Sequence, residues 1–285
     1  MDNLNSLFFR ICVPGALLLM LTACQSSPMA AYRNMPNLHF QVLQGTDFSH
    51  MVVLNDAALR ATASKTISRI NVYIDGDGRP WRRRNSISLD PGPPRARMMA
   101  LMHQDDQAAI YLGRPCYYAL KDEACSPRWW THWRYAPEIV ASLNSALDHL
   151  VVERVQLVLI GHSGGGTLAM LMAASRHDVS AVITLAGNLD IRRWAELHDY
   201  SPLEGSLNPV DFPLPDSVSQ LHFVGRLDEV TPPLLLEEAL PSLTQGVTLP
   251  YFYVIDEIDH SCCWEAHWPD IVREVEARQP GTLSR

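Results

Sequence analysis

A serine lies among closely spaced glycines in the middle of the chain, where residues 161–165 read GHSGG and match the pattern G-x-S-x-G. A serine hydroxyl is a poor nucleophile unless an imidazole takes its proton and a buried carboxylate holds that imidazole. Asp228 and His260 follow Ser163 in the chain and supply these two groups. The order of residue types therefore predicts Ser163 as the nucleophile, Asp228 as the acid and His260 as the base.

Other carboxylates near these positions compete for the role of the acid. Glu229 is the next candidate after Asp228, whereas Asp256 and Asp259 are poorer because each lies beside His260 in the sequence. An aspartate can also simply cap a helix, and an isolated histidine is usually a structural residue. The catalytic interpretation rests on all three groups following strands of their own.

The segments on either side of Ser163 fit the demands of such a nucleophile. Residues 155–160 are almost continuously apolar, as in a strand buried on both faces of a parallel sheet, and residues 167–174 are good helix formers. A serine held in a strained turn crowds the positions two residues away, which explains the glycines there. Strand, sharp turn and helix together predict a nucleophile elbow. A phosphate-binding loop is the alternative, but the P-loop lysine is absent.

The remainder of the chain alternates between strand and helix patterns. We expect strands at residues 38–43, 50–54, 68–74, 108–113, 155–160, 179–186, 220–225 and 251–255, the first two as an antiparallel pair. We expect helices at residues 96–105, 137–150 and 167–174, and one starting near Pro232. This alternation predicts an α/β fold with a mostly parallel sheet and helices on both faces. Residues 188–217 fit no such unit and could form a small cap over the site. Chemistry in such a sheet belongs at the carboxyl ends of the strands, where Ser163, Asp228 and His260 all lie.

A serine nucleophile also needs two N–H donors for the negative charge that develops on the substrate oxygen. One is expected to be the backbone of Gly164, directly after the nucleophile. The other is assigned to the N–H of Asp77, in the sequence DGDG at residues 75–78, with Gly76 and Gly78 as alternatives. Glycine lets this backbone approach a substrate closely, although a plain turn fits the sequence equally well. A carboxylate of this loop could also bind a substrate amine.

The first 23 residues are typical of a secretory signal. Arg10 precedes a short apolar run at residues 11–21, which is too short for a confident membrane span. The sequence LTAC at residues 21–24 resembles the bacterial lipobox, in which the cysteine, here Cys24, is lipidated and becomes the mature N-terminus. The basic region is thin, because Asp2 opposes Arg10. An ordinary cleaved signal and an uncleaved anchor are the alternatives.

The residue after this cysteine predicts the destination of the lipoprotein. Gln25 is not the aspartate that often retains such proteins at the inner membrane, so we expect the outer membrane, with the protein facing the periplasm of a bacterial cell envelope. Residues 24–36 are small and polar enough to form a flexible tether. Residues 37–285 are long enough for one large domain with a sizeable core.

Composition argues against one class of partner. The net charge of −8 and the scattered basic residues give no reason to expect a nucleic-acid partner. Residues 82–84 are three arginines and form the one basic cluster, which a solvated loop explains adequately.

Cysteine use agrees with export. Cys12 would leave with the signal, and four cysteines other than Cys24 then remain, which permit three pairings. These four are Cys116, Cys125, Cys262 and Cys263. In an oxidising compartment we expect a Cys116–Cys125 disulfide that closes a short loop. The adjacent pair could form a strained vicinal bridge or stay reduced. No metal site is expected, because no C-x-x-C spacing is present and adjacent thiols fit a tetrahedral zinc site poorly.

The motifs above resemble those of the α/β-hydrolase superfamily over essentially all of residues 38–285. Several segments are more narrowly similar to a group of bacterial exported α/β hydrolases of unsettled substrate. These segments are DGDG at 75–78, RPCYY at 114–118, WT at 130–131, GHSGGG at 161–166, AGNLD at 186–190, GSLNP at 205–209 and HSCCW at 260–264. The resemblance implies a serine nucleophile, an acyl-enzyme intermediate and no cofactor. It does not imply a substrate, because this fold hosts many chemistries.

The sequence therefore predicts a lipid-anchored periplasmic serine hydrolase that cleaves an ester or a similar acyl bond of a small molecule. An aminopeptidase or amidase is the alternative among enzymes. A catalytically inactive α/β-hydrolase used as a binding protein is the alternative from another class. The intact serine, aspartate and histidine argue against it, because a binding protein has no physical need for all three.

Overall fold

The computed structural model describes residues 28–64, 69–83, 85–120, 122–151 and 155–283. The predicted signal peptide, Cys24 and the tether up to residue 27 lie outside the described residues. Residues 28–36 were expected to continue the flexible tether, but they form turns packed on the domain, with Met29 fully buried in its core. No helix among the described residues is long and apolar enough to cross a membrane.

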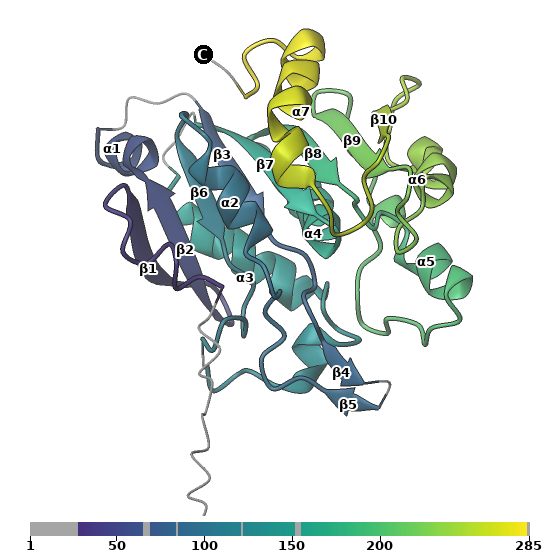
Figure 1. Ribbon diagram of the computed structural model, residues 1–285, viewed down its shortest axis with the longest axis horizontal. Helices are drawn as coiled ribbons and strands as arrows, with labels where there is room; N and C mark the ends of the chain where they lie inside the picture. Colours follow the sequence, from purple (N-terminus) through teal and green to yellow (C-terminus); the bar gives the residue numbers. More distant parts are fainter. Residues whose placement is uncertain (1–27, 65–68, 84, 121, 152–154, 284–285) are drawn as a thin grey trace, which may run out of the picture.

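An eight-stranded sheet crosses the molecule in the order β1-β2-β6-β3-β7-β8-β9-β10 (Figure 1). Its strands are β1 (Leu38–Gln44), β2 (Ser49–Asn55), β3 (Arg69–Ile74), β6 (Ala109–Leu112), β7 (Gln156–His162), β8 (Val179–Leu185), β9 (Ser219–Gly225) and β10 (Tyr251–Ile255). β2 is antiparallel to both of its neighbours, and every other adjacent pair is parallel. The mostly parallel sheet and the antiparallel opening pair are both as predicted.

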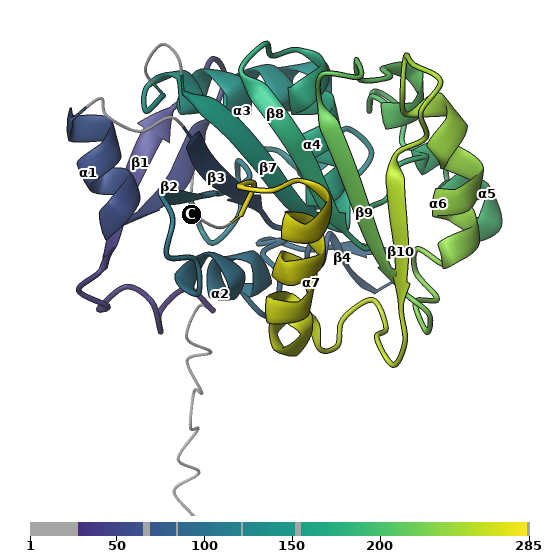
Figure 2. The ribbon, with the colours of Figure 1, turned by 90° about the horizontal axis from the view of Figure 1, so that it is seen from above.

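Helices cover both faces of this sheet, with α2 and α7 on one face and α3 and α4 on the other (Figure 2). The helices are α1 (Asp56–Ser64), α2 (Arg97–His103), α3 (Pro137–Asp148), α4 (Gly164–Ala174), α5 (Ile191–Leu197), α6 (Pro233–Ala239) and α7 (Trp264–Arg278), with single 3₁₀ turns at Pro127–Trp130, Pro209–Asp211 and Leu240–Ser242. The expected helices at 96–105, 137–150 and 167–174 and the one near Pro232 correspond to α2, α3, α4 and α6.

The sheet separates two apolar cores, one on each face, and strand β7 contributes side chains to both. This explains why β7 is a continuous apolar run. Leu157 and Leu159 point into the core beneath α3 and α4, whereas Val158 and Ile160 point into the core beneath α2 and α7. All four side chains are fully buried. A strand buried on both faces needs apolar residues at successive positions, so its sequence shows no alternation.

Three helices and one hairpin were not predicted. The helices are α1, α5 and α7, of which α7 contains a proline at position 269. The hairpin consists of β4 (Trp81–Arg83) and β5 (Ser86–Ile87) and is exposed. A short exposed hairpin has no apolar face to create a period. The segment expected as a cap, residues 188–217, contains α5 and a 3₁₀ turn.

A disulfide between Cys116 and Cys125 closes the loop that follows β6. Cys116 is buried and belongs to the core on the α3 side of the sheet. The hydroxyl of the adjacent Tyr117 donates to the backbone carbonyl of Asp77 at 3.1 Å. The closed loop therefore contacts the DGDG segment.

We predict that loss of the Cys116–Cys125 bond lowers the free energy of unfolding by about 2–3 kcal/mol, because a crosslink across a short loop restricts the unfolded chain. Urea denaturation of the protein with both cysteines changed to serine, compared with wild type, measures the difference. An unchanged stability, or non-reducing peptide maps that pair Cys116 with Cys262 or Cys263, would contradict the assignment.

Candidate active site

Ser163 occupies a strained turn between β7 and α4. Its backbone has φ 53° and ψ −123°, a conformation that residues other than glycine rarely adopt. The flanking glycines are required by contact: a β-carbon at Gly161 would collide with the carbonyl oxygen of Gly165, and one at Gly165 with that of Ile74. The strand, turn and helix thus form the elbow geometry that the sequence predicts.

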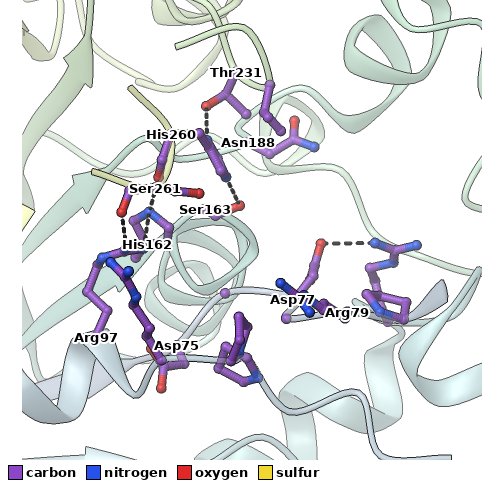
Figure 3. Close-up of a pocket in the computed structure, with 18 of the residues that line it drawn as sticks. Asp75, Asp77, Arg79, Arg97, His162, Ser163, Asn188, Thr231, His260 and Ser261 are labelled. Carbon is purple, nitrogen blue, oxygen red and sulfur yellow. Dashed lines mark hydrogen bonds and ion pairs between the residues drawn. The ribbon is translucent and has the colours of Figure 1, made fainter. Parts of the chain in front are cut away.

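The structure brings Ser163, His260 and Asp228 together from the ends of three strands. Ser163 Oγ lies 2.9 Å from Nε2 of His260, and Nδ1 of His260 lies 2.9 Å from Oδ2 of Asp228. Figure 3 shows the imidazole of His260 between Ser163 and Thr231. Such a chain of hydrogen bonds can carry a proton from the serine hydroxyl to the imidazole and hold the resulting imidazolium against a carboxylate.

The surroundings of Asp228 separate it from the neighbouring Glu229. The Asp228 side chain is fully buried and accepts hydrogen bonds from the backbone amides of Val230 and Thr231 at 2.9 and 2.8 Å. The Thr231 hydroxyl lies 3.0 Å from Oδ2 of Asp228. Glu229 is exposed, and among the described residues it forms no hydrogen bond or ion pair with the His260 ring. Thr231 was not predicted from the sequence, where its only signal is a hydroxyl residue three positions after Asp228.

The two carboxylates beside the histidine are also placed away from its ring. Asp256 is exposed and forms an ion pair with Arg226. Asp259 is exposed as well, and it accepts hydrogen bonds from the backbone amides of Ser261 and Cys262, both at 2.6 Å. These contacts shape the loop that carries His260.

The DGDG segment passes directly beside the nucleophile. A β-carbon at Gly76 would lie 3.1 Å from Cβ of Ser163, and a β-carbon at Gly164 would collide with the carboxylate of Asp77. The Gly164 amide is among the first N–H groups of α4, which have no partner inside a helix. The Asp77 amide has no hydrogen-bond acceptor among the described residues. Gly78 also lines the pocket; it has φ 64°, and a β-carbon there would collide with the carbonyl oxygen of Pro91.

The carboxylate of Asp77 is already occupied. It accepts from Nη1 of Arg134 at 3.0 Å, from the Tyr135 hydroxyl at 2.6 Å and from Nη1 of Arg114. Burial raises the pKa of Asp77, but the positive charges of Arg134 and Arg114 outweigh burial and lower the pKa to about 2. An ionised carboxylate held by two guanidinium groups is not free to bind a substrate amine.

Asp75 is also engaged. Its carboxylate accepts from the hydroxyls of Tyr111 and Tyr118 at 2.9 and 2.8 Å and from the Met98 amide at 3.1 Å. Burial raises the pKa of Asp75 above the ordinary value of a carboxyl group. Neither aspartate of the segment therefore provides a free anion for an amine.

Residues that the sequence analysis did not select hold the histidine loop in place. His162 Nε2 lies 2.9 Å from the carbonyl oxygen of His260, and Arg97 donates to the carbonyl oxygen of Ser261. Burial, followed by the charges of His260 and Arg97, lowers the pKa of His162 well below its ordinary value, so this ring is neutral. The indole of Trp264 also donates to the His260 carbonyl, at 3.3 Å. Nothing in the sequence around Arg97 signals this contact.

The adjacent cysteines follow the histidine loop. The sulfur atoms of Cys262 and Cys263 are joined in the structure, which corresponds to the vicinal bridge of the two alternatives considered. Cys263 has φ 99° and directly precedes α7, while Cys262 lines the pocket described next. No group of three His, Cys, Asp or Glu side chains in the described part of the chain is arranged to hold a metal ion.

An open pocket of about 730 Å³ lies over Ser163. One side consists of residues 75–80 and 93–95, and the other includes residues 230–231 and 260–262. Asn188 and Trp194 complete the lining, and both come from the segment expected as a cap. Ser163 is therefore accessible to a small molecule.

This architecture is the α/β-hydrolase fold, as comparison with solved structures shows. The chain is similar to a putative α/β hydrolase from Agrobacterium tumefaciens (TM-score 0.57, 13% identity, 87% of this chain and 99% of that one). It is also similar to Thermogutta terrifontis esterase 2 (TM-score 0.58, 13% identity, 88% and 97%). A puromycin-hydrolysing peptidase from Mycobacterium tuberculosis matches with TM-score 0.56 and 14% identity, over 85% of this chain and 39% of that one. No protein-family model and no curated protein matches the sequence.

We predict that Asp228→Asn slows the reaction of Ser163 with a fluorophosphonate by several orders of magnitude, on the order of 10⁴ in the best-known triad, because an amide cannot stabilise the imidazolium. Glu229→Gln, the matched control one residue away, should react at the wild-type rate. The labelling rate is measured with circular dichroism as the check on folding. The acid would be misassigned if Glu229→Gln were the slow variant, or if both reacted normally.

Proposed function

We propose that this protein is a serine hydrolase that cleaves carboxylic esters or similar acyl bonds through Ser163, His260 and Asp228. The observation that carries the proposal is the pair of 2.9 Å hydrogen bonds that links the strained serine to the histidine and the histidine to a buried carboxylate, beneath an open pocket. The similarity to structures named as esterases, and to one named as a peptidase, supports a hydrolase in general.

In the proposed reaction, His260 takes the proton of Ser163 as the serine oxygen attacks the substrate carbonyl. The backbone amides of Gly164 and Asp77 hold the oxyanion, and Asp228 stabilises the imidazolium. His260 then protonates the leaving group, which departs and leaves an acyl-enzyme. A water molecule attacks this ester by the same route and releases the acid. Arg114 and Arg134 fix the Asp77 side chain and thereby the position of its amide.

An ester is a better substrate class than a peptide with a free amino terminus. An aminopeptidase needs a carboxylate that is free to bind the α-amine. Asp75 and Asp77, the acidic residues that line the pocket, are both engaged by neighbouring donors. An amidase without such a requirement remains the second choice.

A binding protein would not need the strain at Ser163. A residue with positive φ costs free energy that the surrounding structure must supply. The close packing around this turn leaves no space for a β-carbon at Gly161 or Gly165. Maintaining it is reasonable when the hydroxyl must be presented to a substrate.

We predict that the wild-type protein hydrolyses p-nitrophenyl butyrate and that a fluorophosphonate labels it at Ser163. Ser163→Ala should keep the fold and lose both activities, because the alanine offers no nucleophile. Ser261→Ala is the matched control, since Ser261 lines the same pocket but its hydroxyl contacts neither His260 nor Asp228. Peptide mapping of the probe identifies the labelled residue. A folded wild-type protein that neither reacts with the probe nor hydrolyses any ester or amide would refute the proposed function.

We further propose that the protein is a lipoprotein anchored through Cys24 to the bacterial outer membrane and facing the periplasm. The support is the sequence LTAC at residues 21–24 and Gln25 after it. Only residues 25–28 separate Cys24 from Met29, which is fully buried in the core, so the hydrolase domain would lie close to the lipid surface.

We predict that growth with a palmitate analogue labels the protein and that Cys24→Ala abolishes the label and releases the domain from membranes. Cys12→Ala is the matched control, because Cys12 lies in the apolar run and should be removed with the signal. Membrane fractionation and the mass of the mature N-terminus provide the readout. An unlabelled protein with a different N-terminus would contradict the anchor, and a labelled protein in the inner membrane would contradict only the sorting.

A further inference from the structure

The pocket over Ser163 gathers positive charge on a protein whose net charge is −8. Four arginines line it, namely Arg79, Arg95, Arg97 and Arg134, against two aspartates. Two of these arginines have local partners of opposite charge: Arg97 lies 3.4 Å from Glu265, and Arg134 lies 3.0 Å from Asp77. Arg79 and Arg95 are exposed and have no ion-pair partner among the described residues.

These two arginines lie on segments that pack together on one side of the pocket. The backbone amide of Arg79 donates to the carbonyl of Pro91 at 2.8 Å. A β-carbon at Gly78 would collide with the same carbonyl. Residues 78–80 and 91–95 therefore pack together, and each segment contributes one arginine to the pocket lining. We call Arg79 and Arg95 the basic wall of the pocket.

A buried guanidinium at the pocket adds to this wall. The side chain of Arg134 is only 8% exposed. Its Nε donates to the Thr131 carbonyl at 2.6 Å, and its Nη1 donates to Asp77. Its Nη2 has no hydrogen-bond acceptor in the part of the chain that the structure describes. Since Arg114 also binds Asp77, the group of two arginines and one aspartate keeps a net positive charge beside the nucleophile.

No carboxylate in the pocket lining is free to pair with Arg79 or Arg95. The acidic residues of the lining are Asp75 and Asp77, and both carboxylates already accept hydrogen bonds from side chains of the protein. The other side of the pocket presents neutral groups, among them Asn188, Trp194 and Thr231. A negatively charged ligand group would thus meet donors on one side without repulsion from the other.

We infer that the pocket selects acyl substrates that carry an anionic group, a carboxylate or a phosphate, and that Arg79 and Arg95 determine this specificity. The inference rests on the proposed function for its catalytic part. The anionic group belongs either to the acyl side or to the leaving group of the ester. Both arginines lie outside the hydrogen-bonded chain of Ser163, His260 and Asp228, so they act on substrate recognition.

The test compares charged and neutral esters on the wild-type protein and on the double variant Arg79→Gln/Arg95→Gln. On the acyl side the pair is p-nitrophenyl 4-carboxybenzoate and p-nitrophenyl benzoate. On the leaving-group side the pair is 3-carboxy-4-nitrophenyl butyrate and p-nitrophenyl butyrate. The double variant should lose about tenfold in kcat/KM for the charged member of one pair and stay within about twofold for its neutral member. High ionic strength should reduce the wild-type preference in the same direction.

Arg82→Gln/Arg83→Gln is the matched control, because these arginines are exposed on the β4–β5 hairpin and do not line the pocket. It removes the same net charge, so a general field effect would lower the charged ester equally in both double variants. Equal losses in the two, or no change in the ratio of charged to neutral substrate, would overturn the inference.

A binding measurement separates this inference from the proposed function. Ser163→Ala is titrated calorimetrically with monomethyl terephthalate, alone and combined with Arg79→Gln/Arg95→Gln. Binding that the two substitutions weaken about tenfold supports the anionic subsite even if the wild type hydrolyses no ester, in which case only the proposed function fails. Undetectable binding, or binding equal in the two proteins, together with an unchanged ratio of charged to neutral ester for the leaving-group pair, would overturn the subsite.

Discussion

The close backbone contact between the start of α4 and the end of β3 is the constraint on which the site depends. Gly165 lies against the carbonyl of Ile74, and Gly161 lies against Gly165, with no space for a side chain at either position. This contact excludes side chains on both sides of Ser163, which has a positive φ, and it also brings the segment after β3 next to Ser163. One packing interaction thereby places both the serine and the amides proposed to hold the oxyanion.

Beneath the site, charged and polar groups are buried in pairs and triplets. Two guanidinium groups and a tyrosine hydroxyl surround Asp77, and two tyrosine hydroxyls and an amide surround Asp75. Burying such groups is costly unless each finds its partners. The networks fix the backbone of residues 75–78 from below, and that rigidity is what a preorganised oxyanion site requires.

The parts of this architecture that depend on local pattern could be predicted from the sequence. The apolar run before Ser163, the glycines around it and the strand ends before Asp228 and His260 all leave a signature in residue order. The parts that depend on long-range contact could not be predicted. Arg97 reaches the histidine loop across 164 residues of chain, and Arg134 reaches Asp77 across 57. Neither position stands out within its own segment. The exposed hairpin was missed for a different reason, because it buries no apolar face that would create a period.

Ser163 and His260 follow strands that differ in how many neighbouring strands they pair with. β7 is paired on both sides in the middle of the sheet, whereas β10 is the last strand, paired only with β9, and its residues are half-buried or exposed. Edge elements of this kind open locally at a lower free energy than the centre of a sheet. The histidine loop follows β10, and its additional attachments run to Arg97, His162 and Trp264 on neighbouring elements. Fraying at this edge would move the imidazole of His260 away while Ser163 kept its strained turn, so the proposed triad would be broken in a molecule that is otherwise folded.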